Sequence, residues 1–116
     1  MQKTAIVTGA SKGIGRALAA LLLRNNFEVH GTSRNGKIEG LNHPKLITYS
    51  LNLMKEESIL AFHQQLKAKG VTSDLLINNA GIGPDLNTYE PKAATLRSTL
   101  SVNVEGTILL TELLLP

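Results

Sequence analysis

The chain has 116 residues, of which 42% are hydrophobic and 3% aromatic, and its 12 Lys and Arg against 9 Asp and Glu give a net charge of +3. This length suits one domain, and the ordinary apolar fraction with mixed charges argues against a disordered or low-complexity chain. The absence of Cys excludes disulfides, thiolate metal sites and a cysteine nucleophile.

The basic balance does not by itself indicate nucleic-acid binding, because the positive charges are dispersed and few aromatic residues could stack on bases. The three His residues lack the spacing of metal ligands, so no metal site is expected. The apolar runs are far shorter than a membrane span, and the N-terminus runs straight into a strand pattern without a signal-peptide core. We therefore expect a cytoplasmic protein that binds neither nucleic acid nor membrane.

The first expected element is a strand over residues 4–8, a short apolar run rich in β-branched residues that Gly9 closes. From Ile14, apolar residues recur at spacings of three and four, which predicts a helix that ends at Asn25 and Asn26. Strands are expected over residues 27–32 and 45–51, and the turn-rich stretch between them holds two Gly and a Pro.

The next helix is expected over residues 55–69, because its apolar residues fall on one side and Gly70 supplies a C-terminal cap. Residues 74–78 then form the fourth strand. Its adjacent apolar residues suit a strand covered on both faces, as in a parallel sheet. A last helix is expected to begin near residues 93–96 and to run to the end, where residues 113–115 make it apolar nearly all round.

Four strands alternating with helices predict an α/β fold with parallel strands and right-handed crossovers. In a Rossmann-like, doubly wound sheet these strands lie in the order 3-2-1-4, and the dinucleotide crevice opens between strands 1 and 4. Residues 1–116 are expected to form the N-terminal, dinucleotide-binding part of one such domain, that is, a truncated domain.

The strongest motif is TGASKGIG, residues 8–15, between the first strand and the first helix. Gly9, Gly13 and Gly15 fall where a Cβ would block a sharp turn, the approach of a ligand or the packing of the helix on the strand. The helix N-terminus then offers unpaired N–H groups to a phosphate. This placement favours a dinucleotide site over a chance turn.

The end of the second strand lacks the acidic residue that holds the ribose hydroxyls in sites that prefer NAD. Residues 31–34 read GTSR, and Glu28 lies too early in the strand. Arg34 is well placed to meet a 2′-phosphate, and Lys12 can approach it from the glycine loop. We therefore expect NADP(H) rather than NAD, with two solvated surface cations as the alternative.

With these motifs the sequence resembles the classical short-chain dehydrogenase/reductase family. The resemblance rests on the TGxxxGIG loop, on NNAG at residues 78–81 after the fourth strand, on Asn103 in SVNVEG, and on Lys12 and Arg34, which match positions that accompany NADP(H) in the family.

The resemblance implies a set of cofactor contacts. The pyrophosphate and adenosine ribose would be bound by Gly9, Ser11, Lys12, Gly13, Ile14 and Gly15, the 2′-phosphate by Ser33 and Arg34, the adenine by Asn52 and Leu53, and the adenosine-ribose side by Asn79, Ala80 and Gly81. Asn52 departs from the Asp usual in the family, although an amide can still donate and accept at the adenine edge. For NNAG the alternative is a plain turn.

Asn103 is the one catalytic residue that the resemblance implies here. In the family the helix is distorted at this asparagine, and a freed backbone carbonyl holds a water of the proton relay. The alternative is a hydrogen-bonded polar residue on a buried helix face.

The family's catalytic Ser and YxxxK pair have no match, because Tyr49 and Tyr89 are not followed by Lys four residues later. We therefore expect the N-terminal part of an NADP(H)-dependent oxidoreductase that acts on a small carbonyl or alcohol substrate, and we expect the 116 residues alone to be inactive. The resemblance also implies a homo-oligomer, a dimer or tetramer. The alternatives are a nucleotide-binding fragment without catalysis and a partner protein that pairs through its last helix.

Overall fold

The structure is a computed structural model that describes residues 2–80 and 105–115. Four strands form one sheet in the order β3-β2-β1-β4, with every neighbouring pair parallel. The strands are β1 (Thr4–Val7), β2 (Glu28–Ser33), β3 (Leu46–Ser50) and β4 (Leu75–Ile77). The predicted doubly wound order 3-2-1-4 is confirmed.

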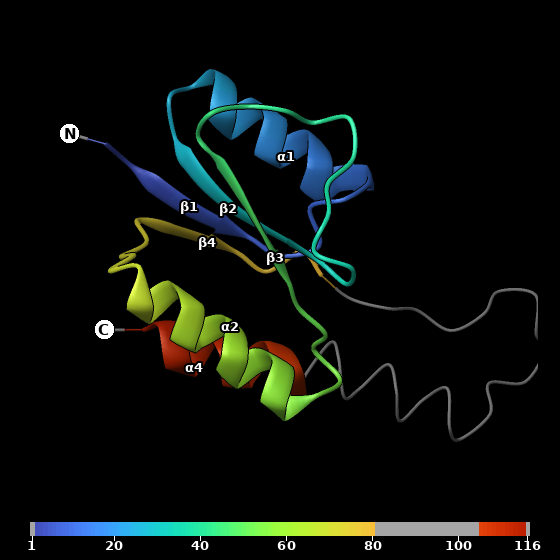
Figure 1. The fold of residues 1–116 in the computed structure, drawn as a ribbon, viewed down its shortest axis with the longest axis vertical. Coiled ribbons are helices and arrows are strands. Elements are labelled where there is room, and N and C mark those ends of the chain that lie inside the picture. The colour runs from blue at the N-terminus through green and yellow to red at the C-terminus, as the bar shows by residue number, and fades with distance from the viewer. Residues whose placement is uncertain (1, 81–104, 116) are drawn as a thin grey trace, which may run out of the picture.

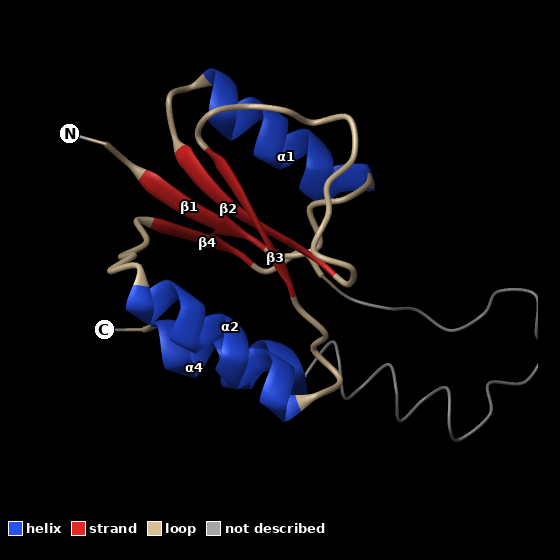
Figure 2. Ribbon diagram, in the orientation of Figure 1, coloured by secondary structure: helices blue, strands red, loops and turns tan. Residues whose placement is uncertain are grey.

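Helices cover both faces of this sheet. The helix α1 (Gly13–Arg24) lies on one face, and α2 (Glu56–Ala68) and α4 (Thr107–Leu114) lie side by side on the other (Figures 1 and 2). This layering brings the ends of β1, β2 and β3 and the loops after them to the edge of the sheet where α1 begins (Figure 1).

The predicted strands and the first two helices differ from the observed bounds by about one residue at each end. The helix stops are confirmed: Asn25 caps α1, Asn26 has a left-handed φ of +65°, and Gly70 after α2 has a φ of +66°. For the last helix, the expected start at residues 93–96 lies outside the described residues, and α4 itself begins at Thr107.

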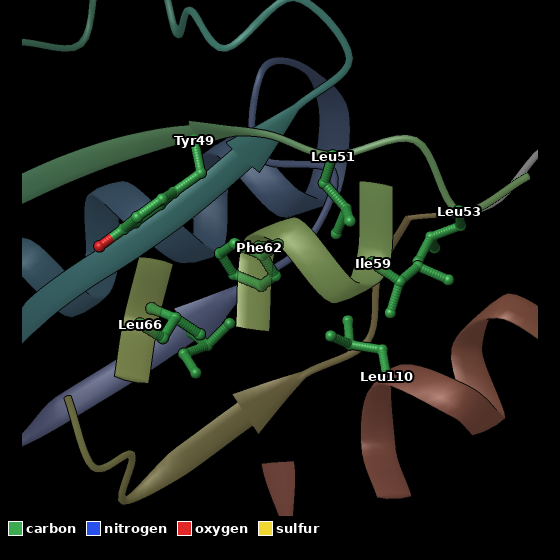
Figure 3. Packing of buried hydrophobic residues seen from close by; sticks show 8 residues of the cluster. Tyr49, Leu51, Leu53, Ile59, Phe62, Leu66 and Leu110 are labelled. Carbon is green, nitrogen blue, oxygen red and sulfur yellow. The ribbon is translucent and has the colours of Figure 1, made fainter. Parts of the chain in front are cut away.

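Each face of the sheet has its own apolar core. On the α1 side the buried cluster is Val7, Ala10, Ala19, Leu23, Val29 and Ile38. On the other side, side chains from β1, from β3 and the loop after it, from α2 and from α4 converge (Figure 3). This second cluster is Ile6, Tyr49, Leu51, Leu53, Ile59, Phe62, Leu66 and Leu110.

Burial at β4 and at the end of the last helix can be compared with the expectations from the sequence. The strand β4 packs against both clusters, Leu76 on the α2 side and Ile77 on the α1 side, as expected for a strand covered on both faces. Leu75, at the start of this edge strand, is 39% exposed. The end of the last helix was expected to be buried on more than one side. Leu113 and Leu114 are partly buried against the core, whereas Leu115 is 63% exposed, so the expectation holds only in part. No helix among the described residues is long and apolar enough to cross a membrane.

Candidate functional site

The glycine loop turns the chain from β1 into α1 at the edge of the sheet. A Cβ at Gly15 would overlap the carbonyl oxygen of Gly9 and the side chain of Asn79, so only glycine permits this close approach. Gly13 has a φ of +61°, and a Cβ there would meet no protein atom within 4 Å. The turn therefore needs glycine for its conformation and leaves open space beside the backbone.

The first turn of α1 is suited to an anion. Lys12 occupies the N-cap position with an extended backbone and makes no side-chain capping hydrogen bond, and no acidic residue lies in the first turn. The N–H groups of that turn thus keep their capacity to donate, and the positive end of the helix dipole is not offset by a local carboxylate. Such a terminus binds phosphate groups well.

Hydrogen bonds hold the loops after β1 and β4 together. The buried Thr8 hydroxyl accepts from the N–H of Asn79 at 3.1 Å and from the N–H of Ala80 at 3.0 Å. The side-chain amide of Asn79 donates to the carbonyl oxygen of Gly9 at 3.1 Å. Asn79 and Ala80 are therefore bound to the glycine loop at the crevice between strands 1 and 4, where doubly wound sheets take their ligands.

A cavity of about 890 Å³ opens at this edge of the sheet, within the size range of small-molecule sites. The predicted residues that line it are Gly9, Ser11, Lys12, Gly13, Ser33, Arg34, Asn52, Leu53, Asn79 and Ala80. Two other predicted residues stand outside the lining: Ile14 is 72% exposed, and Gly15 is buried behind Gly9. Gly81 and Asn103 lie outside the described residues.

Sequence reasoning missed several lining residues. They are Thr32, Asn35, Lys37, Glu39, Leu51 and Met54. Thr32 has a structural role as well, since its hydroxyl accepts from the N–H of Gly9 at 3.3 Å. Its place at the carboxyl end of the second strand was the available signal. For Lys37 and Glu39 there was no signal, because the segment after β2 read only as a turn-rich stretch.

The turn after β2 uses the hydroxyl of Ser33 internally. This buried hydroxyl donates to the carbonyl oxygen of Lys37 at 2.8 Å and lies 3.0 Å from Oδ1 of Asn35, which accepts from the N–H of Lys37 at 3.0 Å. A hydroxyl has one proton to donate. The structure thus places Ser33 on the cavity wall with its proton engaged inside the turn, while the Arg34 side chain is exposed.

The loop after β3 is also internally bonded. The N–H of Asn52 donates to the hydroxyl of Ser58 at 2.8 Å, and Oδ1 of Asn52 accepts from the N–H of Met54 at 3.0 Å. Leu53 is mostly a core residue, and a Cβ at Gly106 would overlap its carbonyl oxygen. At this wall Asn52 can offer its amide N–H groups, and Leu53 offers an apolar surface.

Tyr49 lies away from the cavity, in the core between the sheet and α2 (Figure 3). The ammonium of Lys69 is 3.4 Å from its hydroxyl. Even so, burial, with the Glu28 carboxylate as the smaller cause, raises the pKa of the Tyr49 hydroxyl to about 12. A phenol with this pKa and this position is unsuited to proton transfer at the cavity near neutral pH.

The family model described as short chain dehydrogenase matches residues 3–116. Carbonyl reductase family member 4 of Xenopus laevis is 32% identical over 111 residues, which cover 93% of this chain and 47% of that protein. The chain spans about half the length of the curated relatives it matches.

Solved structures agree with the fold. The 3-ketoacyl-(acyl-carrier-protein) reductase of Brucella melitensis, crystallised with NADH, superposes with a TM-score of 0.87 at 27% identity, over 98% of this chain and 49% of that one. YwfH, an NADPH-dependent reductase involved in bacilysin biosynthesis, gives a TM-score of 0.81 at 27% identity, over 97% of this chain and 52% of that one.

Proposed function

The chain belongs to the short-chain dehydrogenase family, and on this premise we propose that it forms the dinucleotide-binding N-terminal part of an oxidoreductase. That enzyme passes hydride between NADP(H) and a carbonyl or alcohol substrate. The observation that carries the proposal is the cavity itself, which gathers the glycine loop, the residues after β2 and Asn79 with Ala80 around one space of about 890 Å³.

The residues present fit a dinucleotide. The open space beside Gly13 and the uncapped first turn of α1 would receive the pyrophosphate. Ser11, Asn79, Ala80 and Gly81 would lie along the adenosine ribose, and Asn52 with Leu53 would flank the adenine. When bound, the nicotinamide ring supplies or accepts the hydride.

The choice of NADP(H) over NAD rests on charge at the end of β2. Arg34 and Lys12 line the cavity there. Glu28, at the start of β2, is bonded to His30 at 3.0 Å and does not line it. Similar structures include one with NADH and one described as NADPH-dependent, so the fold serves both cofactors, and local charge favours the phosphorylated one.

Asn103 would hold a water of the proton relay through the backbone of its helix. The described residues that begin two positions after it support this role, because residues 105 and 106 are π-helical, and such distortions are frequent at functional sites. No Tyr of the 116 residues is followed by Lys four positions on. We expect no hydride transfer by this chain alone, and cofactor-dependent reduction of an aldehyde by the purified chain would contradict that.

Titration with two nucleotides tests the cofactor assignment. Isothermal calorimetry should give tighter binding of 2′,5′-ADP than of 5′-AMP, and Arg34→Ala should remove most of the difference. Equal affinities for the two nucleotides would contradict the preference for NADP(H). No detectable binding of either nucleotide would contradict the dinucleotide site itself.

The same proposal includes a cytoplasmic homo-oligomer that assembles through the last helix. In its support, the apolar side chains of Ile108 in α4 and of Leu115 directly after it are exposed. Sedimentation of the chain should show a dimer or tetramer that Ile108→Lys dissociates, and a monomer at all concentrations would contradict it.

A further inference from the structure

A third cation lines the cavity beside the two that sequence reasoning found. Lys37 shares the cavity with Lys12 and Arg34. It also lines a second cavity of about 640 Å³, whose lining comes mostly from residues 36–44, so it borders both spaces. Lys12 comes from the glycine loop, whereas Arg34 and Lys37 come from the turn after β2. The three side chains therefore reach one space from two sides.

These cations lack an anionic partner in the part of the chain that the structure describes. None of the three forms an ion pair there. One carboxylate, Glu39, also lines the cavity, so its charged lining side chains sum to a positive value. Like charges that share a cavity without a counter-ion repel one another, and an external anion would relieve that repulsion.

The backbone of Lys37 is fixed on both sides of its Cα. Its N–H donates to Oδ1 of Asn35 at 3.0 Å, and its carbonyl oxygen accepts from the Ser33 hydroxyl at 2.8 Å. The carbonyl oxygen of Arg34 accepts from the Ser50 hydroxyl at 2.8 Å, which ties the turn to the end of β3. The base of the Lys37 side chain is thus held at the cavity, and only its flexible stem remains to be ordered.

We propose that Lys37 is a specificity-determining residue that donates to the cofactor's 2′-phosphate together with Arg34. Ser33 is a positioning residue that acts through the Lys37 carbonyl. The inference rests on the proposed function and deepens it. A phosphomonoester presents three acceptor oxygens with nearly two negative charges, enough for more than one cationic donor.

The test compares Lys37→Gln with Lys37→Arg and with Lys67→Gln. Lys67 is an exposed residue in the last turn of α2 that does not line the cavity, so its loss changes net charge equally. We expect Lys37→Gln to lower the affinity for 2′,5′-ADP about three- to tenfold and to leave the affinity for 5′-AMP unchanged. Lys37→Arg and Lys67→Gln should bind both nucleotides as the parent chain does. The salt dependence of 2′,5′-ADP binding should be shallower in Lys37→Gln alone.

Two failures are distinguishable. If the parent chain prefers 2′,5′-ADP but Lys37→Gln binds it unchanged, the inference about Lys37 is wrong and the proposed function stands. If the parent chain binds the two nucleotides equally or not at all, the proposed function itself is contradicted, and the inference about Lys37 falls with it. If Lys67→Gln lost as much affinity for 2′,5′-ADP as Lys37→Gln, net charge alone would explain the effect. That result would also overturn the role of Lys37.

Discussion

The hydroxyl oxygen of Tyr49 lies 2.6 Å from Nδ1 of His30, in the core between the sheet and α2. The other ring nitrogen of His30 is 3.0 Å from the Glu28 carboxylate, and the Lys69 ammonium is 3.4 Å from the Tyr49 oxygen. A carboxylate only accepts and an ammonium only donates. Lys69 therefore donates to Tyr49, and Nε2–H of His30 donates to Glu28. In a neutral imidazole Nδ1 then carries no proton, so it accepts from the Tyr49 hydroxyl.

Tyr49→Phe should destabilise the chain although it keeps the ring. The change removes the donor to a buried imidazole nitrogen, and such an orphaned acceptor costs about 1–3 kcal/mol. Urea denaturation should show this loss in the free energy of unfolding. Thr48→Ala, at the neighbouring exposed position of β3, is the matched control and should change it by less than about 0.5 kcal/mol. Equal effects of the two changes would rule out a contribution from the network.

Alkaline pH should weaken the fold through the same hydroxyl. The pKa of Tyr49 is raised from 10.0 to about 12, mainly by burial, so the folded chain keeps a proton that the unfolded chain releases. The stabilisation is present below pH 10 and is lost as pH rises from 10 to about 12. The loss amounts to roughly 2–3 kcal/mol.

The difference between the parent chain and Tyr49→Phe isolates this contribution from the titration of lysines. It should be constant up to pH 10 and should shrink above it. A difference in unfolding free energy that stays constant to pH 12 would contradict the raised pKa.

Local chemistry explains why so much of the fold could be predicted. The helix stops at Asn26 and Gly70 need backbone conformations that few other residues adopt, and the glycine loop needs the close approach of Gly15 to Gly9. Residue types and short spacings in the sequence therefore indicate these features directly. The order of the strands then follows from the doubly wound rule, which the sheet obeys.

The remainder depends on contacts between distant segments. His30 reads as an ordinary polar position, yet pairing of β2 with β3 buries it against Tyr49. Lys37 and Glu39 reach the cavity only because the turn after β2 folds back on Ser33. Neither a period nor a motif in the sequence encodes this return of the chain toward Ser33. The cavity wall after β2 was therefore predicted only in part.

Gly15→Ala should abolish nucleotide binding and strongly destabilise the chain, because its Cβ would overlap the Gly9 carbonyl and the Asn79 side chain. Gly70→Ala is the comparison, since a Cβ at that position would meet nothing within 4 Å. Its left-handed φ of +66° should cost about 1–2 kcal/mol and leave binding intact. Thermal unfolding and calorimetry measure both effects. Normal binding of 2′,5′-ADP by Gly15→Ala would show that the loop tolerates the added methyl.

Arg16→Ala should loosen the cavity wall without touching the nucleotide. Arg16 does not line the cavity, but its guanidinium donates to the carbonyl oxygen of Glu39 at 2.6 Å and so ties the segment after β2 to α1. Loss of this hydrogen bond should weaken the binding of 2′,5′-ADP and of 5′-AMP alike, by about two- to fivefold. This pattern differs from that of Lys37→Gln, which should affect the 2′-phosphate alone.

Limited proteolysis measures directly whether the hydrogen bond from Arg16 to Glu39 holds the segment after β2. Trypsin should cleave after Lys37 faster in Arg16→Ala than in the parent chain, because cleavage requires the segment to open locally. Arg24→Ala, an exposed arginine in the last turn of the same helix, is the matched control and should leave cleavage and binding unchanged. If Arg16→Ala is cleaved at the parent rate, the hydrogen bond to Glu39 does not hold the segment, and the wall must be ordered by the Ser33 turn alone.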